Sequence, residues 1–118
     1  MTEIEPDELT SVDELESVLA DSSSKAQLIF KHSLTCPISS RAYEEFKRHL
    51  KASASPGVDY RLIIVQNARN VSNVTAERLD VRHESPQAIL VCGGRAVWHA
   101  SHFDITSSSL EEAIRNNI

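Results

Sequence analysis

The chain has 118 residues, the length of one ordinary domain, which leaves room for a single core. With 41% hydrophobic and 25% charged residues, only three glycines and four prolines, its composition excludes a fibrous or disordered protein. No apolar run approaches the roughly 20 residues of a membrane-spanning helix, and residues 1–8 have neither the basic nor the apolar part of an export signal. We therefore expect one domain over residues 1–118, located in the cytosol and without a membrane partner.

Charge is distributed unevenly along the chain, whose net charge is −5. Residues 1–21 contain eight acidic and no basic residues, so the rest of the chain has nine acidic against twelve basic ones. A mildly basic body favours a small anionic ligand, but it lacks the dense clusters of Lys and Arg that nucleic-acid binding requires. The sequence thus predicts an acidic N-terminal helical region over residues 1–24 and no nucleic-acid partner.

Hydrophobic periodicity and turn residues predict four helices and four strands. Ser11 and Glu14 form a capping box before the first helix, and Pro37 suits the first turn of the second. Gly93 and Gly94 form the two-residue turn of a hairpin. The expected helices are 12–20, 37–50, 70–80 and 106–114, and the expected strands are 27–31, 58–65, 87–92 and 95–99.

This order of elements favours an α/β protein with a mixed sheet. Two strands joined by a helix need a parallel crossover, and a later helix then leads into an antiparallel hairpin. The result is a mixed four-stranded sheet flanked by helices, which is the pattern of a thioredoxin-like fold. A ferredoxin-type sandwich is the alternative, because it uses similar elements with the hairpin in a different order.

Cys36 is the candidate nucleophile. It lies after the first strand and at the start of the second helix, next to Pro37. At a helix N-terminus, unpaired N–H groups and the helix dipole stabilise a thiolate, which can lower the pKa of a thiol there to about 7 or below. The alternative is a small buried hydrophobic residue, a frequent role of a lone cysteine. The polar Thr-Cys-Pro junction favours the reactive thiol.

No second thiol is placed to act with Cys36. Ser39 stands where a Cys-x-x-Cys motif has its second cysteine. Cys92 follows Pro86 by six residues along a strand, roughly 20 Å further on, and reads as a core residue. Cys36 is therefore expected to react with an external thiol.

Pro86 directly precedes a strand, a position that a proline can occupy without breaking the ladder. If the fold is thioredoxin-like, the loop that faces the active cysteine carries a cis-proline. We therefore expect the Ser85–Pro86 peptide bond to be cis and to help hold an extended thiol substrate.

Histidines offer a second kind of candidate. His32 and His83 precede Cys36 and Pro86, and either could favour the thiolate as a cation or transfer a proton. His49 lies in the basic stretch 47–51, which is interpreted as a solvated helix face. No paired spacing of a structural zinc motif is present, so no metal site is expected. The spacing of Cys36 also fits neither a phosphatase loop nor a peroxiredoxin.

Three separated stretches resemble the signature motifs of the monothiol bacilliredoxins, thioredoxin-like proteins of bacteria that make the thiol bacillithiol. The stretches are 31–40, with Thr-Cys-Pro-Ile-Ser at its centre, 83–87 and 97–106. They occur in the same order as in that family and coincide with the expected strands and helices. The resemblance covers most of the chain, from about residue 29 to residue 114.

The resemblance implies a monothiol thiol-disulfide oxidoreductase without a bound cofactor. By position, Cys36 is then the nucleophile that takes bacillithiol from mixed disulfides of client proteins, and a second bacillithiol, as co-substrate, releases it. Ser85 is expected to contribute backbone contacts to the bound thiol. The residues expected to bind the substrate are Thr35, Pro37, Ser85 and Pro86.

Two other functions remain open from the sequence. One is a redox-inactive thioredoxin-like binding module, in which Cys36 merely packs and the acidic N-terminal helix engages a partner. The other is a glutathione-dependent, glutaredoxin-like protein, since these motifs do not distinguish one low-molecular-weight thiol from another.

Overall fold

The computed structural model describes residues 5–118, and each helix and strand expected from the sequence is present. A two-residue strand and a short 3₁₀ turn are added to them. No helix in the described part combines the length and the apolar character that crossing a membrane demands. In chain order the elements are β1 (Asp7–Glu8), α1 (Val12–Asp21), β2 (Ala26–His32), α2 (Pro37–Ala52), β3 (Val58–Ile64), α3 (Arg69–Leu79), β4 (Gln87–Cys92), β5 (Arg95–Ser101), the turn η1 (His102–Asp104) and α4 (Ser107–Asn117).

Five strands form one mixed sheet in the order β1-β3-β2-β4-β5. The central strand β2 is parallel to β3 and antiparallel to β4, and β4 forms a hairpin with β5. Gly93 and Gly94 in the hairpin turn both have a positive φ (60° and 76°), which this two-residue turn needs. The expected mixed sheet is confirmed, whereas the expected number of four strands was wrong.

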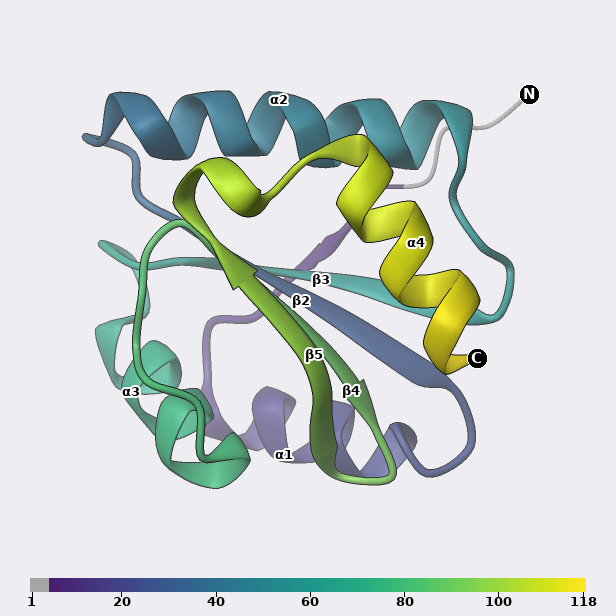
Figure 1. Cartoon of the computed structure of the whole chain (residues 1–118). Coiled ribbons are helices and arrows are strands. Elements are labelled where there is room, and N and C mark those ends of the chain that lie inside the picture. The colour runs from purple at the N-terminus through teal and green to yellow at the C-terminus, as the bar shows by residue number, and fades with distance from the viewer. Residues whose placement is uncertain (1–4) are drawn as a thin grey trace.

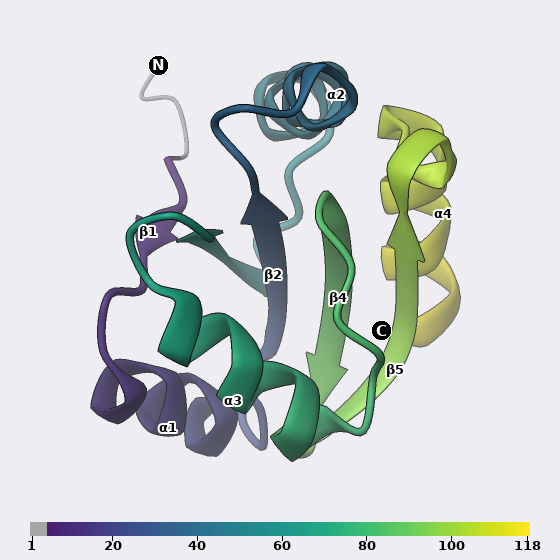
Figure 2. The same ribbon diagram turned by 90° about the vertical axis from the view of Figure 1, so that its left-hand side faces the viewer.

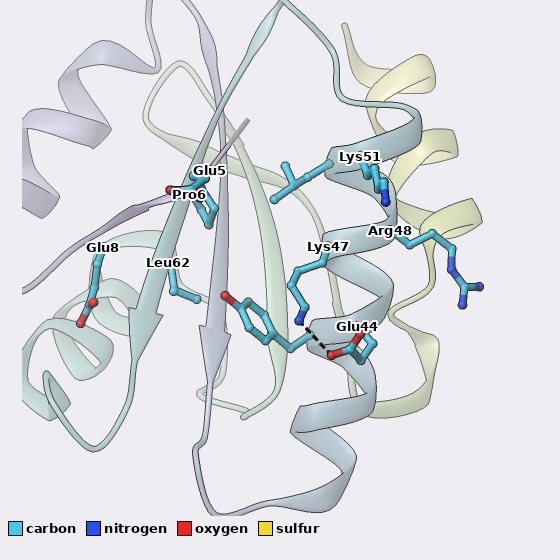
Figure 3. A pocket seen from close by; sticks show the side chains of 10 residues that line it. Glu5, Pro6, Glu8, Glu44, Lys47, Arg48, Lys51 and Leu62 are labelled. Carbon is cyan, nitrogen blue, oxygen red and sulfur yellow. Dashed lines mark ion pairs between the residues drawn. The ribbon is translucent and has the colours of Figure 1, made fainter. Parts of the chain in front are cut away.

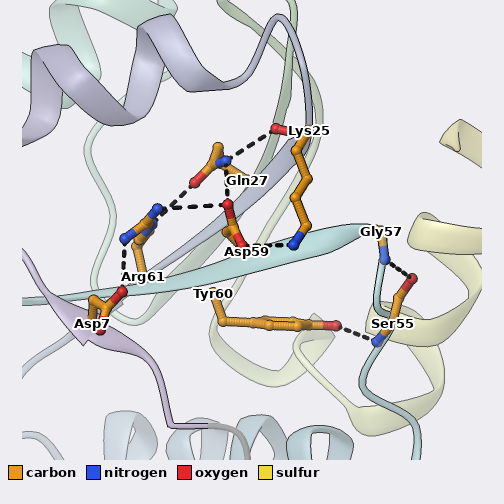
Figure 4. A network of polar contacts seen from close by, with 8 residues as sticks. All are labelled: Asp7, Lys25, Gln27, Ser55, Gly57, Asp59, Tyr60 and Arg61. Atoms are coloured by element: carbon orange, nitrogen blue, oxygen red, sulfur yellow. Dashed lines mark hydrogen bonds and ion pairs between the residues drawn. The ribbon is translucent and has the colours of Figure 1, made fainter.

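The additional strand β1 was missed because nothing in its sequence marks a strand. Both of its residues are exposed acids, so the alternation of apolar and polar residues is absent. Its neighbour β3 holds it: the Arg61 guanidinium donates to Asp7 at 2.8 Å, and the Leu9 amide donates to the Leu62 carbonyl at 2.8 Å. Arg61 also donates to Gln27 of β2, so one arginine links three strands (Figure 4).

Helices cover both faces of the sheet. α2 and α4 lie on one face, and α1 and α3 lie on the other (Figures 1 and 2). Successive residues of β2 point to the two layers: Phe30 packs in the core with α2 and α4, and Ile29 packs in the core with α1 and α3. Because β2 is buried on both faces, its apolar residues Leu28, Ile29 and Phe30 are consecutive rather than alternating with polar ones.

α2 is fixed on the sheet by residues that recur every three or four positions. Ala42, Phe46 and Leu50 are buried at this spacing. His49 lies on the same buried face, so the interpretation of stretch 47–51 as solvated was wrong at this residue. Its Nε2 atom lies 2.8 Å from the Tyr60 hydroxyl, which gives the buried ring a partner. Burial lowers the pKa of His49, so the ring is neutral at pH 7.

Candidate active site

Cys36 occupies the N-cap of the 16-residue helix α2, and its backbone is extended (φ −102°, ψ 120°). Pro37 takes the first helical position, where a missing N–H group costs nothing. The Cys36 carbonyl accepts a hydrogen bond from the Ser40 amide at 3.1 Å. Its side chain makes no capping hydrogen bond, and the residue is partly exposed. The thiol therefore lies where the unpaired N–H groups and the dipole of the helix favour an anion.

Ser39, one turn further along α2, is fully buried. Its hydroxyl oxygen accepts a hydrogen bond from the Ser33 amide at 2.8 Å and lies 2.8 Å from Nδ1 of His32. The position that would carry the second thiol of a Cys-x-x-Cys motif thus carries a hydroxyl that fixes the loop between β2 and α2.

Gln66, which the sequence analysis missed, holds the same loop from the end of β3. Its side-chain oxygen accepts a hydrogen bond from the Leu34 amide at 3.1 Å. Its amide group donates to the hydroxyls of Ser33 and Thr35 at 2.9 and 3.3 Å. The sequence signal was its position: the ends of two parallel neighbours lie at one edge of the sheet, so a polar residue after β3 lies beside the loop after β2.

His32 is the last residue of β2 and is buried on the face that α2 covers. Its ring stacks on Tyr43 of α2, with ring centroids 4.6 Å apart. Burial, and to a smaller extent the Lys47 ammonium, lower the pKa of His32, so the ring is neutral at pH 7. A neutral imidazole can transfer a proton, but it offers no positive charge to a thiolate.

The two buried histidines predict that the protein loses stability in mild acid. In His32 and His49 burial lowers the pKa, so the unfolded chain binds more protons than the folded one as pH decreases below about 6.5. The stability that the two neutral rings contribute is fully present above that pH, and it is lost as pH falls through their lowered pKa values. Urea unfolding at pH 7.5 and pH 5.5 is expected to give the smaller free energy of unfolding at pH 5.5. His49→Gln should weaken this dependence and the exposed His99→Gln should not; a free energy of unfolding equal at both pH values contradicts the argument.

The Ser85–Pro86 peptide bond is cis, and Pro86 is buried. β4 begins directly after this proline and runs antiparallel to β2, so the Pro86 loop and the Cys36 loop lie at the same edge of the sheet. The Pro86 carbonyl accepts a hydrogen bond from the His102 amide at 3.1 Å, which joins this loop to η1.

Not all of the other residues predicted from the sequence lie in the two loops at this edge of the sheet on the same face. Thr35 and Pro37 are exposed on either side of Cys36 in the chain, and Ser85 is partly buried. His83 lies 3.2 Å from the ammonium of Lys31, which points to the face of the sheet opposite His32. The structure therefore places His32 on the α2 face and His83 on the α3 face.

Cys92 lies at the end of β4, far from the candidate site. β4 is antiparallel to β2, so its last residues lie beside the start of β2, whereas Cys36 follows the end of β2. Cys92 packs against the α2–α4 core, and burial raises the pKa of its thiol. Both cysteines are free thiols.

Two exposed apolar side chains belong to segments that adjoin the candidate site, one in the Cys36 loop and one in η1, which is hydrogen-bonded to the Pro86 loop. Leu34, in the loop before Cys36, is 55% exposed, and Phe103 of η1 is 62% exposed. The Arg41 guanidinium of α2 lies 5.6 Å from the centre of the Phe103 ring. Exposed apolar side chains around a reactive group favour contact with another molecule.

Most of the chain is similar to proteins that are already known. The family described as "Monothiol bacilliredoxin BrxC" matches residues 7–110. The chain belongs to the monothiol bacilliredoxin family. A solved structure described as having a thioredoxin fold and a proposed oxidoreductase role is 38% identical, with a TM-score of 0.80, over 92% of this chain and 93% of its own. The family and this relative identify a thiol redox protein.

Thioredoxins proper share the fold with this bacilliredoxin. The thioredoxin of Trypanosoma brucei brucei is 12% identical, with a TM-score of 0.75, over 98% of this chain and 92% of its own. That of Malassezia sympodialis is 15% identical, with a TM-score of 0.76, over 98% and 94%. The expected thioredoxin-like fold is therefore confirmed.

A groove of about 630 Å³ lies elsewhere on this bacilliredoxin, between β1 and α2 (Figure 3). Leu50 and Leu62 are among its lining residues, with acidic and basic side chains around them. Lys47 pairs with Glu44 at 2.9 Å, so opposite charges on its rim compensate one another. Cys36 does not line the groove, and among residues 5–118 no three or more His, Cys, Asp or Glu side chains form a metal-binding group.

Proposed function

We propose that the protein removes bacillithiol, or a similar low-molecular-weight thiol, from mixed disulfides of client proteins. The observation that carries this proposal is the partly exposed Cys36 at the N-cap of α2, with the buried Ser39 in the place of a second thiol. A nucleophilic thiol without a neighbouring partner exchanges with another molecule. Membership of the monothiol bacilliredoxins supports bacillithiol as that molecule.

The proposed reaction is two successive thiol-disulfide exchanges. The Cys36 thiolate attacks the bacillithiol sulfur of the mixed disulfide; that S–S bond breaks, a new one joins Cys36 to bacillithiol, and the client leaves as a thiolate that takes up a proton. A second bacillithiol thiolate then attacks the bacillithiol sulfur on Cys36, releasing the Cys36 thiolate and bacillithiol disulfide. Because bacillithiol supplies the electrons as co-substrate, the proposal needs no bound cofactor and suits the reducing cytosol.

In this proposal one loop at the edge of the sheet carries the attacking thiol, and the other loop at the same edge binds the substrate. Thr35 and Pro37 lie on the surface beside the attacking sulfur, and the loop of Ser85 and Pro86 offers its backbone to the incoming disulfide. His32 is suited to proton transfer rather than to charge stabilisation, because its buried ring is neutral at pH 7.

The proposal is tested with a single-cysteine test protein that carries either bacillithiol or glutathione as a mixed disulfide. The chain is mixed with each substrate without free thiol, and intact-mass and peptide-mapping measurements follow the adduct. We expect bacillithiol to appear on Cys36, not on Cys92, and to be transferred faster than glutathione. Faster transfer of glutathione identifies a glutaredoxin-like protein, and no transfer from either substrate leaves the redox-inactive binding module.

Ser39→Cys is expected to convert the protein into one that closes an internal disulfide. Positions 36 and 39 are one helical turn apart and thus on one side of α2, the spacing of a Cys-x-x-Cys motif. After mild oxidation, intact mass should show the loss of two hydrogens, whereas the wild type keeps its thiol free or bound to a small thiol. Ser39→Ala is the matched control, because it removes the same hydrogen bonds without adding a thiol. A Ser39→Cys chain in which the thiols at positions 36 and 39 both stay free after oxidation contradicts the expectation.

A further inference from the structure

A lysine is buried beside the loop that carries Pro86. Lys31 of β2 is fully buried, and its ammonium donates to the Ser72 carbonyl of α3 at 3.0 Å. The same nitrogen lies 3.2 Å from Nδ1 of His83. Within residues 5–118 no carboxylate forms an ion pair with it. A buried cation without a counter-ion is costly, so its retention calls for an explanation.

The chemistry of this contact defines the state of His83. Burial lowers the pKa of Lys31 to about 8, so the group is mainly an ammonium at pH 7. An ammonium has only donors, so Nδ1 of His83 must accept and the neutral ring carries its proton on Nε2. Burial, the Lys31 charge and Arg69 lower the pKa of His83, while Glu84 opposes them. The Ser72 hydroxyl lies 3.2 Å from the same Nδ1 atom.

Residues 82–86 form no helix or strand, so contacts with neighbouring elements fix their path. At one end the side-chain amide of Gln87 donates to the Arg82 carbonyl at 3.0 Å. At the other end the Pro86 carbonyl accepts from η1 at 3.1 Å. Between them, the contact of Lys31 with His83 joins the loop to β2 and, through Ser72, to α3.

We propose that Lys31 is a positioning residue: its buried ammonium holds His83, and with it the Pro86 loop, in the position that receives the mixed disulfide. Lys31 touches neither Cys36 nor the reacting sulfur atoms in this role. The inference rests on the proposed function, because it assumes that the Pro86 loop meets the substrate.

The test compares two reactions of the same thiol. Exchange with a bacillithiolated test protein requires the Pro86 loop, whereas alkylation of Cys36 by iodoacetamide does not. Lys31→Met keeps the apolar stem and removes the charge; we expect exchange to slow by about ten- to a hundredfold, the scale of a misplaced substrate, with alkylation unchanged within about twofold. Ile29→Val, on the same strand and face, is the control for lost packing and should change neither rate.

His83 variants separate positioning from proton transfer. The side-chain oxygen of glutamine can accept the ammonium's N–H, so His83→Gln should keep exchange within about threefold of wild type, while His83→Leu should slow it as Lys31→Met does. The double variant with Lys31→Met and His83→Leu should be no slower than either single one, because both remove one contact. Equal loss in His83→Gln and His83→Leu, or normal exchange in Lys31→Met, overturns the proposal.

An NMR titration makes failure of this inference distinguishable from failure of the proposed function. Because the Lys31 charge lowers the pKa of His83, Lys31→Met should raise the pKa of that imidazole, whatever the substrate is. An unchanged His83 titration refutes the contact itself. A raised pKa together with no exchange by the wild type refutes the proposed function and, with it, the role in exchange.

Discussion

Serine in place of Cys36 is expected to abolish the exchange of mixed disulfides. A hydroxyl at this position is not ionised at neutral pH, so no nucleophile remains at the N-terminus of α2 to attack a disulfide sulfur. The rate of thiol transfer should fall by a factor on the order of 10⁴ or more, the scale of loss when an enzyme loses its nucleophile. The measurement is the release of the client thiol from a bacillithiolated test protein, followed by mass spectrometry over time.

Cys92→Ser is the matched control for this experiment. Cys92 lies at the opposite end of the sheet from Cys36, and burial raises the pKa of its thiol, which leaves less thiolate to react. We expect this variant to exchange within about twofold of the wild-type rate. Transfer that survives in Cys36→Ser and disappears in Cys92→Ser would show that Cys92 is the reacting cysteine and would refute the mechanism.

The thermal stability of Cys36→Ser shows whether a loss of activity is caused by unfolding. Cys36 is the N-cap of α2 and makes no capping hydrogen bond, whereas serine is among the preferred N-cap residues. Cys36→Ser should therefore have the same free energy of unfolding as the wild type, or one that is higher by up to about 1 kcal/mol. Its unfolding temperature should accordingly be equal or higher. An inactive variant with this thermal stability ties the loss to the sulfur.

Strong local signals made the fold and the position of Cys36 predictable. β2 contains a short apolar run, α2 begins at Pro37 and repeats its apolar residues at helical spacing, and two glycines mark the hairpin. Each of these signals lies within a few neighbouring residues, so no knowledge of distant contacts is needed. Because Cys36 directly precedes Pro37, its place at the start of the helix followed from the same signal.

The residues that the sequence did not reveal depend on distant partners. His49 is buried because Tyr60 on β3 offers a hydroxyl to its ring, and periodicity contains no record of that partner. Gln66 holds the Cys36 loop only because β3 ends next to β2. Lys31 stands in an apolar strand where its charge looks like an interruption, and only the contacts with α3 and with His83 explain it.

Removing the Phe46 ring is expected to cause the largest loss of stability. Phe46 of α2 is fully buried and stacks on Phe30 of the central strand, with ring centroids 4.8 Å apart and planes inclined by 11°. The rings of Tyr43 and Tyr60 pack around it, with centroids 6.3 and 6.2 Å from the centroid of the Phe46 ring. Phe46→Ala should therefore cost about 3–5 kcal/mol, because it loses both the burial of the ring and the contacts around the cavity. That is a large part of the roughly 5–15 kcal/mol that stabilise an ordinary domain.

Thermal and urea unfolding measure this loss, and an exposed phenylalanine provides the control. Phe46→Ala should lower the Tm by about 10–25 °C, since 1 kcal/mol corresponds to several degrees in a domain of this size. Phe103→Ala removes the same ring from a site that is 62% exposed and should shift the Tm by no more than about 2 °C. Phe46→Leu, which fills part of the space, should lie between the two. A loss below about 1.5 kcal/mol in Phe46→Ala would mean that α2 does not rest on β2 through this ring, and the position of Cys36 at the edge of the sheet would lose its main support.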